Sequence, residues 1–125
     1  MTIRLLDTNS CTYLFTGAHP ALTARVAEQP EGTLFISSIT YAELACGTVR
    51  GKPPPPETLA AFVSEVAVLP FDEAAAMAYA QIPFRRGSFD RLIAAHALAM
   101  GAGLVSRNAR DFADIPGLQV EDWTA

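Results

Sequence analysis

The sequence places acidic and amide side chains directly after several of its apolar runs. Asp7 follows the run "IRLL", and Glu43 lies in the first turns of the helical pattern after "TLFIS". Asp90 opens the helical pattern "FDRLIAAHALAM", while Asn108 and Asp111 follow "GLVS". In an open parallel sheet, ligands bind beyond the carboxyl ends of the strands, where the chain leaves for its helices. We therefore expect these side chains to gather at one edge of one sheet.

Three carboxylates brought together repel one another unless a cation or a proton lies among them. Two of them about 4 Å apart repel by roughly 4 kcal/mol at an effective dielectric constant of about 20. Protonation would relieve this repulsion, but it requires raised pKa values and usually serves acid–base work on small substrates. Ligand sets made of oxygen alone select hard ions. Asp7, Glu43 and Asp90 are therefore predicted to bind Mg²⁺ or Mn²⁺.

Each of these acids also has a purely structural interpretation. Thr40 and Glu43 have the spacing of a capping box, in which Glu43 would satisfy the start of its helix. Asp90 follows Ser88 by two residues, and the helix dipole favours an acid in a first turn. Asp7 would itself cap a helix that begins shortly after it. Residue types and spacing alone leave the metal site and the capping roles both open.

Basic residues gather in the same part of the sequence as the later acids. Five of the nine lysines and arginines lie within 26 residues, namely Arg85, Arg86, Arg91, Arg107 and Arg110. A positive rim around an acidic metal pocket suits phosphodiester cleavage, because arginine grips phosphates while the metal carries the reacting oxygens. The alternative is a set of solvated helix faces and surface pairs with Asp111 and Asp114. The residues themselves do not decide between these two interpretations.

Apolar runs alternate with helical patterns from end to end, which predicts an α/β fold with a mostly parallel sheet and helices on its faces. The closing "LQVEDW" is expected to add a further strand. The prolines of "GKPPPPETL" predict an exposed bend, with Glu57 opening the next helix. At 125 residues, with no internal repeat or linker, the chain is expected to form one domain over residues 1–125.

Composition excludes several classes of protein. No apolar stretch reaches the length of about 18 residues that a membrane span needs, and no secretory leader opens the chain, so we expect a cytoplasmic protein. A net charge of −4 argues against general attraction to nucleic acid, so a polyanion must be held locally. Cys11 and Cys46 lack C-x-x-C spacing and are predicted to be buried, reduced thiols. His19 and His96 have no zinc-ligand spacing, and His96 is expected to pack within its helix.

The combination of motifs resembles a known family. "LLDTN", "SSITYAEL", "GSFDRLIAAHAL", "LVSRNARDF" and "IPGLQVEDW" are similar, in this order and over nearly the whole chain, to PIN-domain proteins of the VapC toxin group. The resemblance implies a three-layer α/β/α fold with a central sheet of four to five strands. It also implies an Mg²⁺- or Mn²⁺-dependent endoribonuclease that forms homodimers and is inhibited by a VapB-type antitoxin.

The family's site carries over residue by residue. Asp7, Glu43 and Asp90 match its three core acids, and the fourth acidic position of many PIN domains falls on Asn108. Asp111, three residues later, either stands in for that acid or supports the site from behind. The segment "YAQIPFRRGSFD" before Asp90 is shorter than in many relatives, which alters the expected substrate groove.

Neutral and aromatic residues complete the expected site. Thr8 and Asn9 are predicted to fix the turn after Asp7 and to hydrogen-bond this acid or metal-bound water, with Ser106 doing likewise across the pocket; helix capping is the alternative for each. Stacking on unpaired bases of an RNA is a further role for aromatic residues, for which packing in the core is the commoner one. The residues concerned are Tyr13, Phe84 and Phe89.

Two other functions remain compatible with the sequence. One is a phosphohydrolase or receiver-like domain that uses Asp7 as phosphoryl acceptor. Such sites normally have a second acid two residues on and a lysine on a later strand, whereas this chain has Asn9 and a single lysine, Lys52, in the proline-rich bend. The other is a catalytically silent interaction module that keeps the fold for antitoxin or RNA binding.

Overall fold

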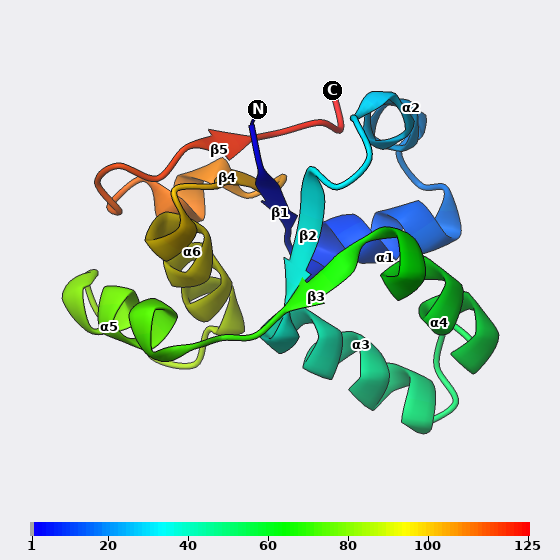
Figure 1. Ribbon diagram of the computed structural model, residues 1–125, viewed down its shortest axis with the longest axis horizontal. Helices are drawn as coiled ribbons and strands as arrows, with labels where there is room; N and C mark the ends of the chain where they lie inside the picture. The colour runs from blue at the N-terminus through cyan, green and yellow to red at the C-terminus, as the bar shows by residue number, and fades with distance from the viewer. Residues whose placement is uncertain (1) are drawn as a thin grey trace.

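The computed structural model describes residues 2–125, and these residues build a five-stranded sheet whose neighbouring strands are all parallel (Figure 1). The strand order across the sheet is β3-β2-β1-β4-β5. The strands are β1 (Arg4–Leu6), β2 (Leu34–Ser37), β3 (Ala67–Leu69), β4 (Gly103–Val105) and β5 (Val120–Glu121). The α/β fold expected from the sequence is confirmed, including the strand predicted in "LQVEDW". Because the strands run in parallel, their carboxyl ends share one edge of the sheet.

Helices cover both faces of this sheet (Figure 1). They are α1 (Thr8–Thr16), α2 (Pro20–Glu28), α3 (Ser38–Val49), α4 (Pro56–Glu65), α5 (Glu73–Gln81) and α6 (Phe89–Met100), with a 3₁₀ turn η1 (Ala109–Phe112). Helices α5 and α6 pack on one face and α1, α2 and α4 on the other, while α3 contributes to both cores. The arrangement is the predicted three-layer α/β/α fold.

The alternation of side chains along the two central strands explains why there are two cores. Leu5 and Leu104 point to the α5–α6 side, and the next residues, Leu6 and Val105, point to the opposite side. Successive residues of a strand face opposite sides of the sheet, so four buried apolar residues anchor both helical layers. The central strands β1 and β4 are therefore fixed from both faces, and the turns that follow them are held in place.

The proline-rich bend differs in part from the expectation. Glu57 does lie in the first turn of α4, which begins at Pro56, a position that tolerates proline because its missing N–H has no helical partner. The bend is not fully exposed, however, because Pro54 is buried. The hydroxyl of Thr48 donates a hydrogen bond of 2.7 Å to the Pro54 carbonyl, which ties the bend back to α3.

The two end segments of the chain meet in a cluster of paired charges on the α2 side of the sheet. Glu121 accepts a 2.6 Å hydrogen bond from Arg4 and lies 3.6 Å from Arg25. Both guanidinium groups also lie over the buried Trp123 ring, at 5.2 and 4.9 Å from its centroid. A Cβ at Gly103 would lie 3.3 Å from Glu121 Oε2, so the absence of a side chain there allows the close approach. We call Arg4, Arg25, Glu121 and Trp123 the paired cluster.

No helix within residues 2–125 has the length and apolar character needed to cross a membrane.

Candidate functional site

Asp7 lies at the carboxyl end of β1 and is almost fully buried, with 2% of its surface exposed. Its backbone N–H donates to the Val105 carbonyl of β4, and its Oδ1 accepts a 2.8 Å hydrogen bond from the backbone N–H of Ser10. Asp7 is thus the N-cap of α1, as the structural interpretation proposed. Capping engages Oδ1 and leaves Oδ2 for other contacts, so capping and ligand binding are compatible here.

Glu43 lies in the second turn of α3, directly after β2. Its helix is capped by Ser37, whose hydroxyl accepts from the Ile39 N–H. The capping-box interpretation of Thr40 and Glu43 is therefore wrong, because β2 runs into α3 without a loop and Thr40 already lies inside the helix. Glu43 instead accepts a 2.6 Å hydrogen bond from the hydroxyl of Thr8, the first residue of α1.

This contact gives Thr8 a different role from the one expected. It donates to Glu43 and lies 3.4 Å from the Thr40 hydroxyl, rather than serving Asp7. The start of α1 and the start of α3 are joined through it, which fixes the direction of the Glu43 side chain. Asn9 is exposed, and its side chain takes no part in the side-chain hydrogen bonds found among residues 2–125.

Asp90 lies in the first turn of α6, half buried and without a side-chain cap from Ser88. Burial raises the pKa of Asp90, and the negative charges of Asp7, Glu43 and Asp111 raise it further. Carboxylates from four separate segments therefore act on one another electrostatically at this edge of the sheet. We call Asp7, Glu43 and Asp90 the acidic edge.

No basic side chain compensates the acidic edge in the part of the chain that the structure describes. The ion pairs there involve Glu121 and Asp114 and none of the three acids. Nor do any three Asp, Glu, His or Cys side chains of residues 2–125 stand close enough together to hold a metal ion as they are oriented. The three carboxylates of the acidic edge are close enough to act on one another electrostatically. Hydrogen bonds from Thr8 and Ser10 orient two of them, those of Glu43 and Asp7.

The residues that follow β4 form the other side of this edge. Ser106 is buried, and its hydroxyl accepts from the backbone N–H of Asn108, so it shapes the turn rather than reaching across to Asp7. Asn108 is half buried at the start of η1, and Asp111 is exposed. Both line a hollow of about 480 Å³ together with Arg107 and Arg110.

Arg91 is the candidate that the structure contradicts most clearly. Phosphate binding and surface pairing with Asp111 and Asp114 were its two expected roles, but only 2% of its surface is exposed. Its guanidinium group forms an ion pair of 2.8 Å with Asp114 and donates to the carbonyls of Pro83 and Asp111. Arg91 thus ties the segment before α6 to the segment after β4, and its burial leaves almost no guanidinium surface for a phosphate.

The remaining arginines lie at the surface. Arg86, Arg107 and Arg110 are exposed, whereas Arg85 lies 3.5 Å from Asp114 and is shared with that carboxylate. His96 packs inside α6 as expected, and its Nδ1 lies 2.8 Å from the Ser37 hydroxyl. It joins α6 to the cap of α3, the two helices that carry Asp90 and Glu43.

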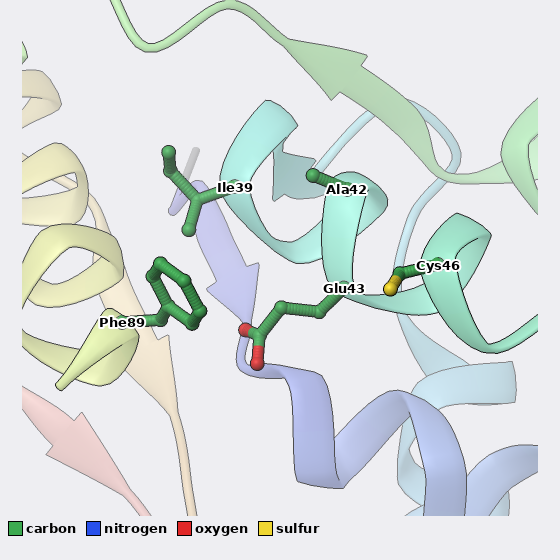
Figure 2. A pocket seen from close by; sticks show the side chains of 5 residues that line it. All are labelled: Ile39, Ala42, Glu43, Cys46 and Phe89. Atoms are coloured by element: carbon green, nitrogen blue, oxygen red, sulfur yellow. The ribbon is translucent and has the colours of Figure 1, made fainter. Parts of the chain in front are cut away.

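A second pocket, of about 380 Å³, adjoins Glu43 (Figure 2). Its walls are Ile39, Ala42, Glu43 and Cys46 of α3 and Phe89 of α6. No pattern in the sequence indicated this pocket, because Cys46 was expected to be buried and Phe89 was expected to lie in the core. Both are exposed, and so is Phe84, whereas Tyr13 does pack partly against the core.

Comparison with known proteins identifies the family. Residues 4–118 match the family model of the PIN domain. The chain is 34% identical to the tRNA(fMet)-specific endonuclease VapC of Shigella flexneri, an alignment that covers 96% of this chain and 97% of the relative. The chain belongs to the VapC group of PIN-domain proteins.

Solved structures of VapC-family complexes have the same fold. One is DNA-bound VapBC from Salmonella typhimurium, with a TM-score of 0.81 and 34% identity over 98% of this chain and 99% of that chain. Another is VapBC-1 from nontypeable Haemophilus influenzae, with a TM-score of 0.83 and 31% identity over 99% of this chain and 100% of that chain. The resemblance to the VapC group is confirmed, and with it the expected class of enzyme, a ribonuclease of a toxin–antitoxin pair.

Proposed function

We propose that this VapC-family endoribonuclease hydrolyses RNA phosphodiester bonds at the acidic edge, with Asp7, Glu43 and Asp90 as its catalytic acids. The supporting observation is that acids from separate segments lie near one another at an edge without a paired basic side chain among residues 2–125. Burial, and then the charges of Asp7, Glu43 and Asp111, raise the pKa of Asp90 there. A stable fold maintains such repulsion only at a cost, and sites of this kind concentrate where function requires them.

The donor set fits a hard divalent cation, for which we propose Mg²⁺ or Mn²⁺. Every side chain of the acidic edge offers oxygen ligands, and a cation among them would relieve the repulsion that adds to burial in raising the pKa of Asp90. When bound, such an ion activates water for attack and stabilises the charge that develops on the phosphate. Asp7 and Asp90 would hold it, while Glu43, oriented by Thr8, completes the site or orients the attacking water.

The β4 side of the edge supplies the remaining polar groups. We place Asn108 as the fourth polar ligand and Asp111 behind it, because Asp111 is exposed but still acts on Asp90. Arg107 and Arg110 border the same hollow and are free to bind RNA phosphates through their forked donors. The exposed Arg86 extends this surface. Arg85 does so as well, but an RNA phosphate there would compete with Asp114 for its guanidinium group.

A VapB-type antitoxin is the partner that the family assigns to this chain. The Salmonella and Haemophilus structures are VapBC complexes. An acidic edge without its own basic partner would accept a cationic antitoxin side chain in place of the metal ion, and so be inhibited. We further propose that the toxin is a homodimer in the cytoplasm, where its RNA substrate lies.

The test is RNA cleavage by the purified protein with Mg²⁺, Mn²⁺ or EDTA. Wild type should cleave with either ion and not with EDTA, and Asp90→Asn should lower the rate by about 10²- to 10³-fold or more. The matched control is Glu73→Gln, which removes another first-turn acid, at the start of α5. Full activity of a folded Asp90→Asn protein would contradict the proposal, and an inactive wild type would favour the silent interaction module.

A further inference from the structure

The pocket beside Glu43 is lined by an aromatic ring, three small or apolar side chains and one carboxylate. Figure 2 shows the Phe89 ring on one side of the pocket and Ala42 and Cys46 on the other, with Ile39 above and the Glu43 side chain below. Phe89 is 59% exposed, so the ring is open to a ligand and not occupied by core packing. At about 380 Å³, the pocket lies within the usual size range of small-molecule sites.

The pocket is continuous with the acidic edge through two residues. Glu43 lines the pocket while its carboxylate accepts from Thr8 at the start of α1. Phe89 is the residue before Asp90, and both lie in the first turn of α6. A nucleotide whose phosphate lies at the acidic edge therefore has its base within reach of the Phe89 ring.

We infer that this pocket holds one unpaired nucleobase of the RNA, next to the bond that is cut. The inference rests on the proposed endoribonuclease function and adds to it a determinant of substrate choice. Proteins recognise single-stranded RNA by stacking its bases on aromatic side chains and by hydrogen bonds to the base edges. Phe89 is the stacking surface, and Glu43 offers acceptor oxygens at the edge of the slot.

Charge at the outer rim favours a nucleotide over an apolar side chain of a protein partner. Arg50 Nη1 donates to the carbonyl oxygen of Cys46 at 3.2 Å and contacts its Sγ at 2.9 Å. A guanidinium group therefore stands beside the pocket wall that faces Phe89. An RNA strand that leaves the pocket on this side has its next phosphate near Arg50, which completes an alternation of phosphate, base and phosphate sites.

The first experiment compares aromatic variants on single-stranded RNA oligonucleotides. Phe89→Ala should lower kcat/KM by about 5- to 150-fold, the range expected for loss of one stacked base, and Phe89→Trp should keep the wild-type kcat/KM. The matched control is Met77→Ala, because Met77 is an equally exposed apolar side chain, at 58%, on α5 and does not line the pocket. Equal losses from Met77→Ala and Phe89→Ala, or no rescue by tryptophan, would overturn the inference.

The second experiment removes the base instead of the ring. Oligonucleotides with a single abasic residue on either side of the cut should lose a similar factor in kcat/KM with wild type, at one of the two positions. With Phe89→Ala the same abasic residue should cause no further loss, because ring and base act as one contact. Independent, multiplicative losses would show that Phe89 acts on something other than that base.

The third experiment measures occupancy of the pocket, by protection of Cys46 from alkylation, without RNA cleavage. Cys46 is an exposed thiol of the pocket wall, whereas Cys11 is fully buried and its burial raises the thiol pKa. In the Asp90→Asn protein, N-ethylmaleimide should alkylate Cys46, and a single-stranded RNA 12-mer should slow this reaction. An abasic 12-mer of equal charge should not, and Cys46→Ser provides the unlabelled control.

The outcomes of this last experiment separate the inference from the proposed function. Equal protection by both 12-mers would assign the contact to phosphates and overturn the inference. No protection by RNA, with protection by the antitoxin, would make the pocket a protein-binding site and also overturn it. Protection by the base-bearing 12-mer supports the inference even if no RNA is cleaved by wild type, a result that would contradict the proposed function alone.

Discussion

A partly buried carboxylate has a lowered pKa in the paired cluster and a raised pKa at the acidic edge. In the paired cluster, burial opposes ionisation of Glu121, but hydrogen bonds from Arg4 and Trp123 and the charges of Arg4 and Arg25 outweigh it and lower the pKa. At the acidic edge, burial and three like charges act together and raise the pKa of Asp90. The first region satisfies its charges within the fold, whereas the second leaves them for a ligand from outside.

We infer from this difference that the paired cluster stabilises the fold and that the acidic edge serves the reaction. Glu121 is held by groups from β1, α2 and the residues after β5, so its charge joins distant segments. Two acids of the edge, Glu43 and Asp7, are positioned by neutral groups, the Thr8 hydroxyl and the Ser10 N–H, and these do not cancel their charge. Stability and activity should therefore respond to substitutions in separate regions.

Trp123→Ala should have the largest effect on stability. Trp123 is 2% exposed and supports both arginines, and truncation of a buried tryptophan typically costs about 3–5 kcal/mol. Urea denaturation should show this loss, while cleavage per folded molecule stays near wild type. If the Trp123→Ala protein cleaved RNA as slowly per folded molecule as the Asp90→Asn protein, the two regions would not be independent.

Glu121→Gln should have an intermediate effect, about 1 kcal/mol, because the carboxylate is only partly buried and solvent screens its ion pairs. The folded-state pKa of Glu121 lies below the unfolded value, so its stabilisation is present above the ordinary pKa of 4.5 and is lost as pH falls through the folded value. Unfolding free energies measured between neutral and acidic pH should converge for wild type and Glu121→Gln at the acidic end. A constant difference at every pH would assign the effect to packing.

Asp90→Asn should have the smallest effect on stability and the opposite sign. Removing one of several like charges should raise stability in EDTA by about 0.5 kcal/mol at neutral pH. Because the pKa of Asp90 is raised from 3.8 in the folded state, its destabilisation is present above the folded pKa and disappears as pH falls toward the unfolded value. Thermal unfolding in EDTA should therefore show the variant's advantage at pH 7 and not near pH 4. Saturating Mg²⁺ should stabilise wild type more than the variant.

Some positions were predictable from the sequence because local patterns determine them. Asp7, Glu43 and Asp90 follow strands or open helices, and a parallel sheet brings such positions to one edge whatever the loops do. Their shared neighbourhood follows from the fold class alone. Their use as metal ligands stays a prediction until it is measured.

Other positions depend on contacts between distant segments. Pairing of the basic stretch with Asp114 was one of two interpretations, but both placed Arg91 at the surface, because nothing local shows that a partner 23 residues away encloses it. A signal was nevertheless present, since Arg91, Ala94, Ala95 and Leu98 follow the spacing of a buried helical stripe. The exposure of Cys46 and Phe89 had no such signal, because it depends on how closely α3 approaches α6.

The strand order determines when the acidic edge can form during synthesis on the ribosome. The backbone N–H of Asp7 donates a hydrogen bond to the Val105 carbonyl, and β1 lies between β2 and β4. The N-terminal strand β1 therefore cannot complete its pairing until β4 has been synthesised. Synthesis adds about 5–20 residues per second, and non-local pairings form only after both strands exist. A nascent chain that ends before β4 cannot assemble the acidic edge, so cleavage by ribosome-bound chains should begin only when residues 103–105 are free to pair. With catalysis at the acidic edge as proposed, a growing chain should leave the RNA around it uncut until its translation is nearly finished.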